Sequence, residues 1–491
     1  MTHQPVSLAT FLLVGAITLT LAACSNDNGG NSGGGHPPAP SAALVYLADQ
    51  DIEGVDELYL LGSNGTSTKL NPALPVGRSV TRFRITPDKT AVVYRADQDT
   101  DDLLELYRVP LATPGVSTKL NGPLASQQKK QFFDFQFTPD SSAVLYTASP
   151  LPLFILELYR VPLTTSGVST RLNGPLVANG DVIDNGKGDF QVTPDGSAVV
   201  YLAVQDTVGV IELYRVPLAT PGVSTKLNGP LGANGDVYGF QVTPDSSAVV
   251  YLANQDAEGV SELYRVSFAA PGVSTKLNGP LGANMDVLDV QVTPDSSAVV
   301  YLADQDDATG ELYRVSFAAP GVSTKLNSPL AANGHVGDFQ FTPDSSAVLY
   351  TATPAPLGIP ELYRVLLTTP GVSTKLNGPL EGYVQDVHVT PDSSAVVYLA
   401  NLKTTDSFRL YRASFVAPGV STELNGPLVA NGGSVQKFQV TPDGSAVVYR
   451  AVQDTDGVIE LYRVPLATPG VSTKLNGPLV AHGGVRDFAF P

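Results

Sequence analysis

One unit of about 50 residues recurs along this 491-residue chain from Ser41 onward. Each copy runs through AVVYLA, ELYRV, GVSTKLNGPL and DFQVTPD in that order, with small changes between copies. The Thr-Pro-Asp marker recurs at intervals of 48 to 55 residues, at Thr86, Thr138, Thr193, Thr243, Thr293, Thr342, Thr390 and Thr441. Such a period is typical of propeller blades and other solenoids, whose units share one continuous core. The repeat therefore overrides the two to four domains that length alone would suggest.

Each unit contains segments that predict β-strands. Residues 198–202 (AVVYL) and 213–216 (LYRV) are rich in β-branched and aromatic residues, and residues 190–193 (FQVT) alternate between apolar and polar positions. Residues 193–196 (TPDG) place proline and glycine at the second and fourth positions, which suits a type I turn. Although the chain has 46 glycines and 39 prolines, its 43% share of hydrophobic residues argues against disorder and favours an all-β fold.

The two ends of the repeat region complement each other. Residues 43–47 (ALVYL) match the AVVYLA segment, and residues 487–491 (DFAFP) match DFQFTP, so that together they complete a ninth quartet of strands. A linear solenoid would need a polar cap at each end, whereas pairing of the first and last strands leaves no exposed edge at the seam. We therefore predict that residues 42–491 form one closed β-propeller of nine four-stranded blades, closed by N- and C-terminal strands within one blade.

The segment before the repeat has a different composition. Residues 8–23 form an apolar run that is too short to span a bilayer comfortably, and the run ends in Leu-Ala-Ala before Cys24, the single cysteine of the chain. The tetrad resembles the lipobox of bacterial lipoproteins, which implies that residues 1–23 are a signal peptide and that Cys24 carries lipid. The alternative is an ordinary signal peptide with an incidental cysteine. Residues 24–41 are rich in Gly, Ser, Asn and Pro and predict a flexible tether.

The repeat unit also resembles a known family. Residues 193–201 (TPDGSAVVY), followed by Gln205, Asp206 and Gly209 and then by residues 212–214 (ELY), are similar to the TolB-like propeller repeat. The resemblance covers residues 43–491 and implies a propeller fold. It does not imply one activity, because such blades serve transport-linked scaffolds, sugar-active enzymes and peptidase lids alike.

Charge and residue types exclude several function classes. The formal net charge of −17 makes nucleic acid an improbable partner, because the phosphate backbone would be repelled. The five histidines lie in different segments and have no cysteine partner: His3, His36, His335, His388 and His482. We therefore expect no metal site, no cofactor and no catalytic residues. Three acidic turns, at residues 97–102, 304–307 and 454–457, could hold Ca²⁺, although Asp and Gly are also ordinary turn formers.

These observations favour a non-catalytic binding scaffold, tethered outside the cytoplasm in the cell envelope, that engages a protein or a polysaccharide. One alternative is a propeller enzyme that uses carboxylates in its channel, and another is a purely structural envelope protein. The near-identity of the units argues against an enzyme, because a catalytic site brings unlike residues together and copies of one blade supply mostly the same ones.

Differences between the units point to a binding face. The TPDSSA and ATPGVS turns should share one face of the ring, and the AxQDxxG turns and the links after TKLN should share the other, where the units differ. One unit replaces a polar turn by residues 150–154 (PLPLF), and an exposed apolar loop often marks a contact site. We therefore predict that Leu151, Leu153 and Phe154 contact the partner. The alternative is that the link from Asn173 to Thr193, which is longer than the links of most other units, covers Leu153 and Phe154.

Replacement of Cys24 with serine is expected to release the protein from the membrane fraction, because the thiol that would carry the lipid is lost. Cell fractionation followed by immunoblotting measures this, with Ser32→Ala in the tether as a control that should remain bound. A Cys24→Ser protein that sediments with membranes as completely as the parent would show that the lipid anchor is not there.

Overall fold

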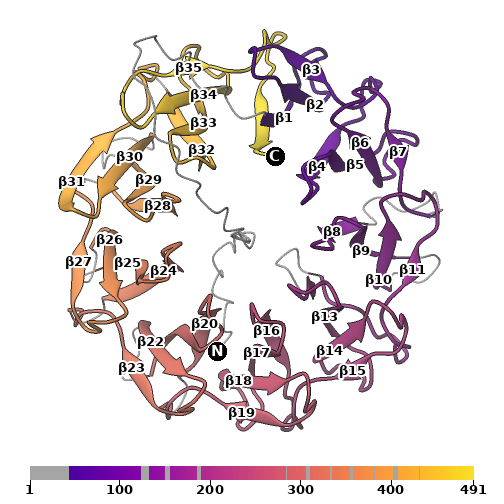
Figure 1. Cartoon of the computed structure of the whole chain (residues 1–491), viewed down its shortest axis with the longest axis vertical. Helices are drawn as coiled ribbons and strands as arrows, with labels where there is room; N and C mark the ends of the chain where they lie inside the picture. The colour runs from indigo at the N-terminus through magenta and orange to yellow at the C-terminus, as the bar shows by residue number, and fades with distance from the viewer. Residues whose placement is uncertain are drawn as a thin grey trace, which may run out of the picture.

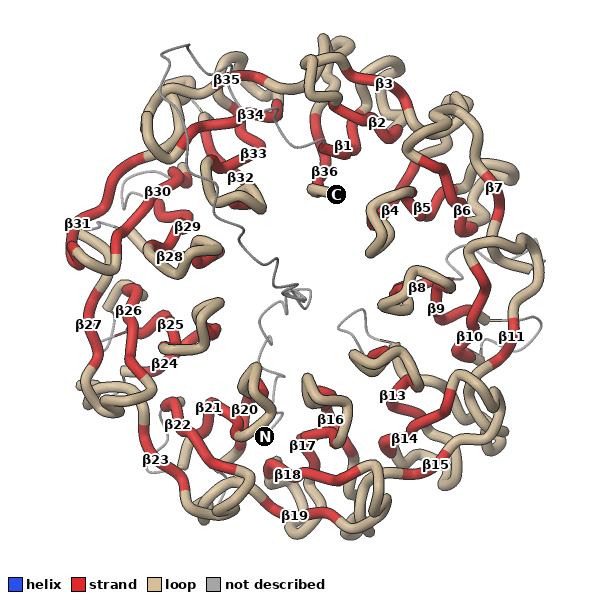
Figure 2. Tube along the Cα trace, in the orientation of Figure 1, coloured by secondary structure: helices blue, strands red, loops and turns tan. Residues whose placement is uncertain are grey.

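The computed structural model describes residues 44–122, 132–149, 155–184, 190–282, 285–305, 310–331, 334–353, 358–379, 382–401, 407–430 and 432–491. Within these ranges the chain forms nine four-stranded sheets that stand as blades around a common axis (Figure 1). The described residues contain strands and turns only, and none of them forms a helix able to cross a membrane (Figure 2). The nine-bladed, all-β ring predicted from the repeat is confirmed.

The two inner positions of each blade are taken by the strands of the DFQV and AVVYLA segments. The innermost strands lie nearest the axis: β36 (Val485–Ala489), β4 (Val80–Ile85), β8 (Phe132–Phe137), β12 (Phe190–Val192), β16 (Val237–Val242), β20 (Val287–Val292), β24 (His335–Phe341), β28 (Val384–Val389) and β32 (Ser434–Val440). The second strands come from the AVVYLA segment: β1 (Leu44–Ala48), β5 (Ala91–Ala96), β9 (Ala143–Ala148), β13 (Ala198–Ala203), β17 (Ala248–Ala253), β21 (Ala298–Ala303), β25 (Ala347–Thr353), β29 (Ala395–Asn401) and β33 (Ala446–Val452).

The two outer positions follow in the same order. The third strands come mostly from ELYRV: β2 (Glu57–Leu61), β6 (Glu105–Pro110), β10 (Glu157–Pro162), β14 (Glu212–Pro217), β18 (Glu262–Ser267), β22 (Glu311–Ser316), β26 (Glu361–Leu366), β30 (Phe408–Ser414) and β34 (Glu460–Pro465). The outermost strands are mostly short: β3 (Ser67–Lys69), β7 (Thr118–Lys119), β11 (Thr170–Arg171), β15 (Thr225–Lys226), β19 (Ser274–Lys276), β23 (Ser323–Lys325), β27 (Ser373–Lys375), β31 (Ala417–Glu423) and β35 (Thr473–Lys474).

Blade 1 combines β36 with β1, β2 and β3, and blades 2 to 9 take the remaining strands four at a time, from β4–β7 to β32–β35. Neighbouring strands in every blade are antiparallel. Eight of the nine sheets are therefore built from contiguous sequence, and one is shared between the two ends of the repeat region.

The hydrophobic core lies between the blades rather than at the axis. In β13, Val199 and Tyr201 belong to a buried cluster shared with blade 3, whereas Val200 and Leu202 belong to a cluster shared with blade 5. Successive residues of a strand point to opposite faces, so a strand covered on both faces must be apolar throughout. This explains the uninterrupted AVVYL sequence, in which each fully buried aliphatic side chain contributes roughly 1.5–3 kcal/mol.

A stacked tyrosine pair recurs in the blades and fixes the pairing of the two central strands. Tyr201 on β13 lies opposite Tyr214 on β14, and their ring centroids are 5.7 Å apart. The Tyr201 hydroxyl donates to Gln205 Oε1 at 2.7 Å, so the polar end of the buried ring is satisfied. The glutamine of the QD turn is therefore a structural residue in this blade.

The ring closes in blade 1, where β36 pairs with β1. Tyr46 lies opposite Phe488, and Leu47 lies opposite Asp487, although more than 400 residues separate the partners along the chain. The strand buries Phe488 in a cluster that spans blades 9 and 1. Closure thus continues the same interblade packing across the seam and pairs β1 along both of its edges.

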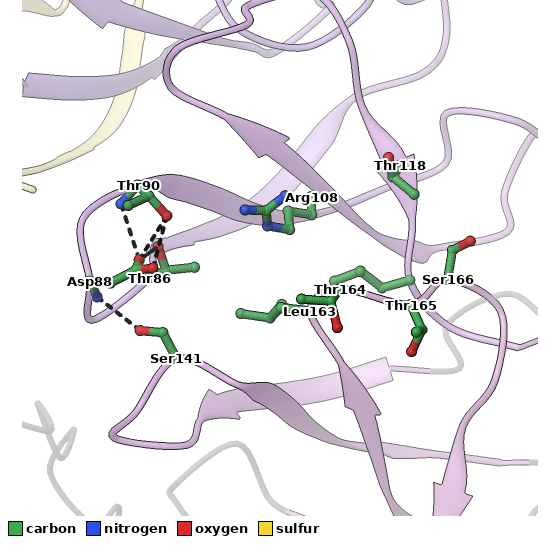
Figure 3. Close-up of a pocket in the computed structure, with 11 residues that line it drawn as sticks. Thr86, Asp88, Thr90, Arg108, Thr118, Ser141, Leu163, Thr164, Thr165 and Ser166 are labelled. Atoms are coloured by element: carbon green, nitrogen blue, oxygen red, sulfur yellow. Dashed lines mark hydrogen bonds between the residues drawn. The ribbon is translucent and has the colours of Figure 1, made fainter.

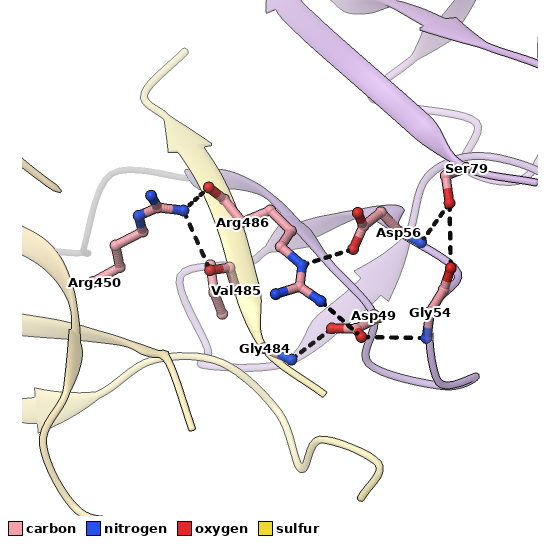
Figure 4. A network of polar contacts seen from close by, with 8 residues as sticks. All are labelled: Asp49, Gly54, Asp56, Ser79, Arg450, Gly484, Val485 and Arg486. Atoms are coloured by element: carbon pink, nitrogen blue, oxygen red, sulfur yellow. Dashed lines mark hydrogen bonds and ion pairs between the residues drawn. The ribbon is translucent and has the colours of Figure 1, made fainter. Parts of the chain in front are cut away.

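Polar contacts reinforce the seam (Figure 4). Arg486 Nη2 lies 3.1 Å from Asp49 Oδ2, and Arg486 Nε lies 3.2 Å from Asp56 Oδ1. The backbone N–H of Gly484 donates to the other oxygen of Asp49 at 2.5 Å. Arg450 of blade 9 donates to the backbone carbonyl of Arg486. One arginine therefore joins the last strand to two carboxylates of the first strands, and blade 9 holds it from the other side.

Deletion of residues 485–491 is expected to lower the melting temperature strongly and to promote self-association, because β1 becomes an exposed edge and the Val485 and Phe488 side chains leave the core. Calorimetry and light scattering measure the two effects, with removal of Pro491 alone as the control. A truncated protein that stays monomeric and melts with the parent would mean that the ring does not need this strand.

Candidate functional site

The two faces of the ring carry different turns, as the order of segments predicted. The TPD turns join the inner to the second strands, and the TPG turns join the third to the outer strands. Because successive strands are antiparallel, these two turns share one face. We call it the uniform face, since both turns scarcely change between blades. The QD turns and the links between blades share the opposite, variable face.

The aspartates of the uniform face are engaged in turn structure. Thr193 Oγ1 donates to Asp195 Oδ1 at 2.6 Å, and the backbone N–H of Ser197 donates to the same oxygen at 3.0 Å. Burial opposes the ionised form, but these hydrogen bonds hold the pKa of Asp195 below its ordinary value. The backbone N–H of Asp195 also donates to Ser246 Oγ of blade 5. The backbone of the TPD turn therefore links neighbouring blades, while its carboxylate holds the turn in shape.

The buried glutamates are engaged in a similar way. Glu212 at the start of β14 is 4% exposed, and it accepts from Lys226 Nζ and from the Tyr214 hydroxyl, each at 2.9 Å. Burial, followed by the hydrogen bond and charge of Glu212, raises the pKa of Tyr214. Corresponding Glu–Lys pairs occur in other blades, for example Lys474 with Glu460. These carboxylates are paired with cations, as buried charges must be to offset their desolvation.

Glutamines of the inner strands tie several blades to their neighbours near the axis. The backbone N–H of Val242 donates to Gln191 Oε1 at 2.9 Å, and that of Val292 donates to Gln241 Oε1 at 2.8 Å. In other blades the glutamine donates instead, and Gln340 Nε2 reaches a backbone carbonyl of blade 8 at 2.6 Å. The inner strands thus form a belt of side-chain to backbone bonds that fixes their mutual positions.

Against this uniform frame, a β-bulge at the start of several inner strands presents unlike side chains. In β16 the register shifts between Val237 and Gly239, so Tyr238 has no cross-strand partner. A bulge re-aims the extra side chain, and such features are frequent beside functional sites. The residues at this position, which we call the bulge residues, are all exposed and all different: Thr81, Tyr238, Leu288, Gln436 and Arg486.

Two of the bulge residues are apolar or aromatic and sit in neighbouring blades. Tyr238 of blade 5 is 53% exposed and Leu288 of blade 6 is 41% exposed. Each lies near the first residue of its inner strand, directly after the link from the preceding blade. Both residues are therefore at the variable face. Sequence reasoning missed these two positions. The signal that could have found them is the difference between copies at one repeat position in otherwise similar units.

Charged residues next to the bulges pair across blade boundaries. Arg84 Nη2 of blade 2 lies 3.1 Å from Asp134 Oδ1 of blade 3, and Arg82 Nη2 lies 3.2 Å from the same oxygen. Lys437 of blade 9 lies 2.5 Å from Asp487 Oδ1 of blade 1. These ion pairs replace the neutral contacts of other interfaces, so the charge along the inner strands differs from one boundary to the next.

One boundary brings two carboxyl groups together instead. Asp289 on β20 and Asp338 on β24 occupy equivalent positions in blades 6 and 7. Burial raises the pKa of Asp289 to about 7, an effect to which the charge of Asp338 adds and which the N–H of Val290 opposes. Burial also raises the pKa of Asp338. A carboxyl group with this pKa is protonated in a large share of molecules at neutral pH.

The residues predicted to act from sequence are not among those that the structure describes. Cys24, the predicted lipid attachment site, lies outside the described residues. Leu151, Leu153 and Phe154, the predicted partner contacts, also lie outside them, and their roles stay predictions.

Two of the residues considered for metal binding, His388 and Asp97, have partners among the described residues. His388 contacts the ring of Phe438, with centroids 4.8 Å apart, and lies 3.2 Å from Asp386 Oδ1. Asp97, from an acidic turn considered for Ca²⁺, accepts from the backbone N–H of Ser79 at 2.8 Å. Within the described ranges, no group of three or more His, Cys, Asp or Glu residues is placed to hold a metal ion.

No protein-family model and no curated protein matches this chain. Solved structures do resemble it. A crystal structure of a eukaryotic initiation factor aligns over 91% of this chain and 98% of its own length, with a TM-score of 0.59 at 10% identity. A prolyl endopeptidase aligns over 86% of this chain and 54% of its own length, with a TM-score of 0.45 at 13% identity. At such identities the likeness shows the fold alone, and the chain is a nine-bladed β-propeller.

Proposed function

We propose that this protein is a lipid-anchored, extracytoplasmic propeller of TolB-like type that acts as a non-catalytic scaffold and binds a protein or a polysaccharide. The lipobox-like sequence at Cys24 supports the anchor and the location. The non-catalytic scaffold is supported by the structural role of the repeated polar side chains. Threonine, aspartate, glutamate and glutamine side chains that repeat around the ring bond to their own or the neighbouring blade.

The observation that carries the proposal is the set of exposed bulge residues on an otherwise uniform frame. A repeat that keeps its structural residues constant while varying one exposed position per blade presents a different chemical group at each step around the axis. Tyr238 and Leu288 supply exposed apolar area in adjacent blades. Aromatic and apolar anchors of this kind, surrounded by polar residues, are typical of interface centres.

Replacement of Tyr238 and Leu288 together with alanine is expected to weaken partner binding by at least about 30-fold, because even a single interface anchor contributes roughly 2 kcal/mol or more. The melting temperature should change little, since both side chains are largely exposed. The assay is cross-linking and capture from detergent-solubilised envelopes with full-length protein. Replacing Leu151, Leu153 and Phe154 with serine in the same assay tests the contact role predicted for them.

Val273 and Val322 provide a matched control, because they lie in the same two blades, are each 68% exposed and belong to the uniform face. Their double alanine variant should capture the partner as the parent does. Equal loss in both double variants, or undiminished capture by the Tyr238/Leu288 variant, would rule out the variable face as the binding surface.

A second candidate is a propeller enzyme, and the pairing of Asp289 with Asp338 favours it. A carboxyl group that keeps its proton near neutral pH is in the state that a general acid requires. The two residues come from neighbouring inner strands, where a ligand of the axial region would meet them. On this alternative, the full-length protein releases new reducing ends from an envelope polysaccharide, and the Asp289→Asn variant does not.

Asp289→Asn is expected to stabilise the protein at pH 8 but hardly at pH 4. The folded state holds the Asp289 proton more tightly than the unfolded chain, so the wild type loses stability as pH rises from about 4 through about 7. The asparagine variant has no proton to lose. At about 1.4 kcal/mol per pKa unit, the difference at pH 8 is at most a few kcal/mol. Thermal unfolding at both pH values measures it, and an equal effect at both would show that Asp289 titrates normally.

A further inference from the structure

A pocket of about 340 Å³ opens on the uniform face between blades 2 and 3 (Figure 3). Leu120 and Leu163 are among its lining residues, and Arg108 of β6 extends toward it from blade 2. The rim is made of hydroxyl groups from the TPD turn of blade 2 and from the turn after β10 in blade 3. A volume near the lower end of the range for ligand pockets suits a ligand the size of one or two sugar rings.

Arg108 lacks the aromatic cover of the arginines in blades 4, 5 and 7, a difference that it shares with Arg160, Arg314 and Arg412. The guanidinium carbon of Arg215 lies 4.8 Å from the ring centre of Phe268 in the next blade, and that of Arg265 lies 4.7 Å from Phe317. In those blades the aromatic ring covers one face of the guanidinium. At Arg108 the next blade supplies Leu163 instead.

The guanidinium of Arg108 also has unused hydrogen-bonding capacity. Its Nε is buried and has no hydrogen-bond partner among the described residues. A buried donor without a partner costs free energy, and a bound acceptor would remove that cost. The Nε atoms of Arg215 and Arg265 likewise lack a partner, so Arg108 differs from them in lining a pocket instead of lying against an aromatic ring.

Hydroxyl groups gather at this pocket more densely than at its counterparts. Thr164, Thr165 and Ser166 follow one another on the rim, and no other unit of the chain has the sequence TTSG here. Within the described part of the chain, their side chains make no hydrogen bond. They are exposed and free to bond to a ligand. A hydroxyl both donates and accepts, which suits the hydroxyls of a sugar.

Asp88 sets a further condition on the ligand. Partial burial opposes its ionisation, but hydrogen bonds from Thr86 and Thr90 and the charge of Arg108 hold the pKa of Asp88 below its ordinary value. The carboxylate is thus ionised beside the pocket at neutral pH. It can accept from a sugar hydroxyl, and it repels a second negative charge on any ligand that already pairs with Arg108.

We propose that this pocket binds a sugar that carries a single carboxylate, such as a hexuronate. The planar fork of Arg108 matches the two oxygens of a carboxylate, and the hydroxyls of blade 3 together with Asp88 bond to the sugar hydroxyls. The pocket lies on the uniform face, away from the bulge residues. It is a second site, which stands whether or not the variable face binds a partner.

The test is a calorimetric titration of the full-length protein with each of four compounds: glucuronate, glucose, acetate and sulfate. Glucuronate should bind at least 10-fold more tightly than glucose, which lacks the carboxylate, and than acetate, which lacks the hydroxyls. Sulfate, a dianion, should bind no better than acetate. Equal binding of glucose overturns the role of Arg108, and equal binding of acetate or tighter binding of sulfate overturns the assignment to a sugar acid.

Two variants locate the site. Arg108→Ala should weaken glucuronate binding by about 10- to 100-fold, because a charge-assisted hydrogen bond to the carboxylate is lost. Leu163→Phe should also abolish binding while preserving the melting temperature, because a phenylalanine at the corresponding position covers the arginine in blades 4 and 5. Arg265→Ala is the matched control and should bind glucuronate as the parent does. Undiminished binding in both Arg108 and Leu163 variants, or no binding by the parent, overturns the proposal.

Discussion

The pairing of β36 with β1 is the constraint on which the rest of the molecule depends. Every blade buries both of its faces against neighbours, so a missing neighbour exposes a full apolar surface. Only a closed ring supplies two neighbours to each blade, and in this chain closure requires strands from both ends of the repeat region. The ion pairs of Arg486 with Asp49 and Asp56 add polar contacts at the seam, where no covalent connection joins β36 to β1.

Closure also separates structural from variable residues. Buried apolar strands, TPD turns, Glu–Lys pairs and inner-strand glutamines hold the blades together. In most blades the bulge residue is therefore not needed to stabilise the ring. Arg486 is the exception, because it belongs to the bulge position and to the seam. At the Arg108 pocket a leucine takes the place of the phenylalanine that covers the arginine in blades 4, 5 and 7, and the hydroxyl groups of Thr164, Thr165 and Ser166 line the opening.

The sequence predicted the fold well because the signals for it are local. The AVVYLA and ELYRV strands follow from side-chain type, and the TPDG turn follows from the backbone preferences of proline and glycine. The candidate sites depend on contacts between blades, which local patterns do not encode. The residue facing Arg108 is Leu163, 55 positions further along the chain, and Asp289 meets Asp338 only after two blades have packed. The bulge at Tyr238 likewise arises from register between strands, which residue type alone does not fix.

Hydrogen–deuterium exchange across the full-length protein tests the closed ring most directly. If the ring is closed as described, the backbone amides of β1 exchange as slowly as those of β13, and those of β36 as slowly as those of β16, the corresponding strands of blades of contiguous sequence. Exchange of β36 at the rate of the exposed turns, while β16 stays protected, would contradict closure by the terminal strands.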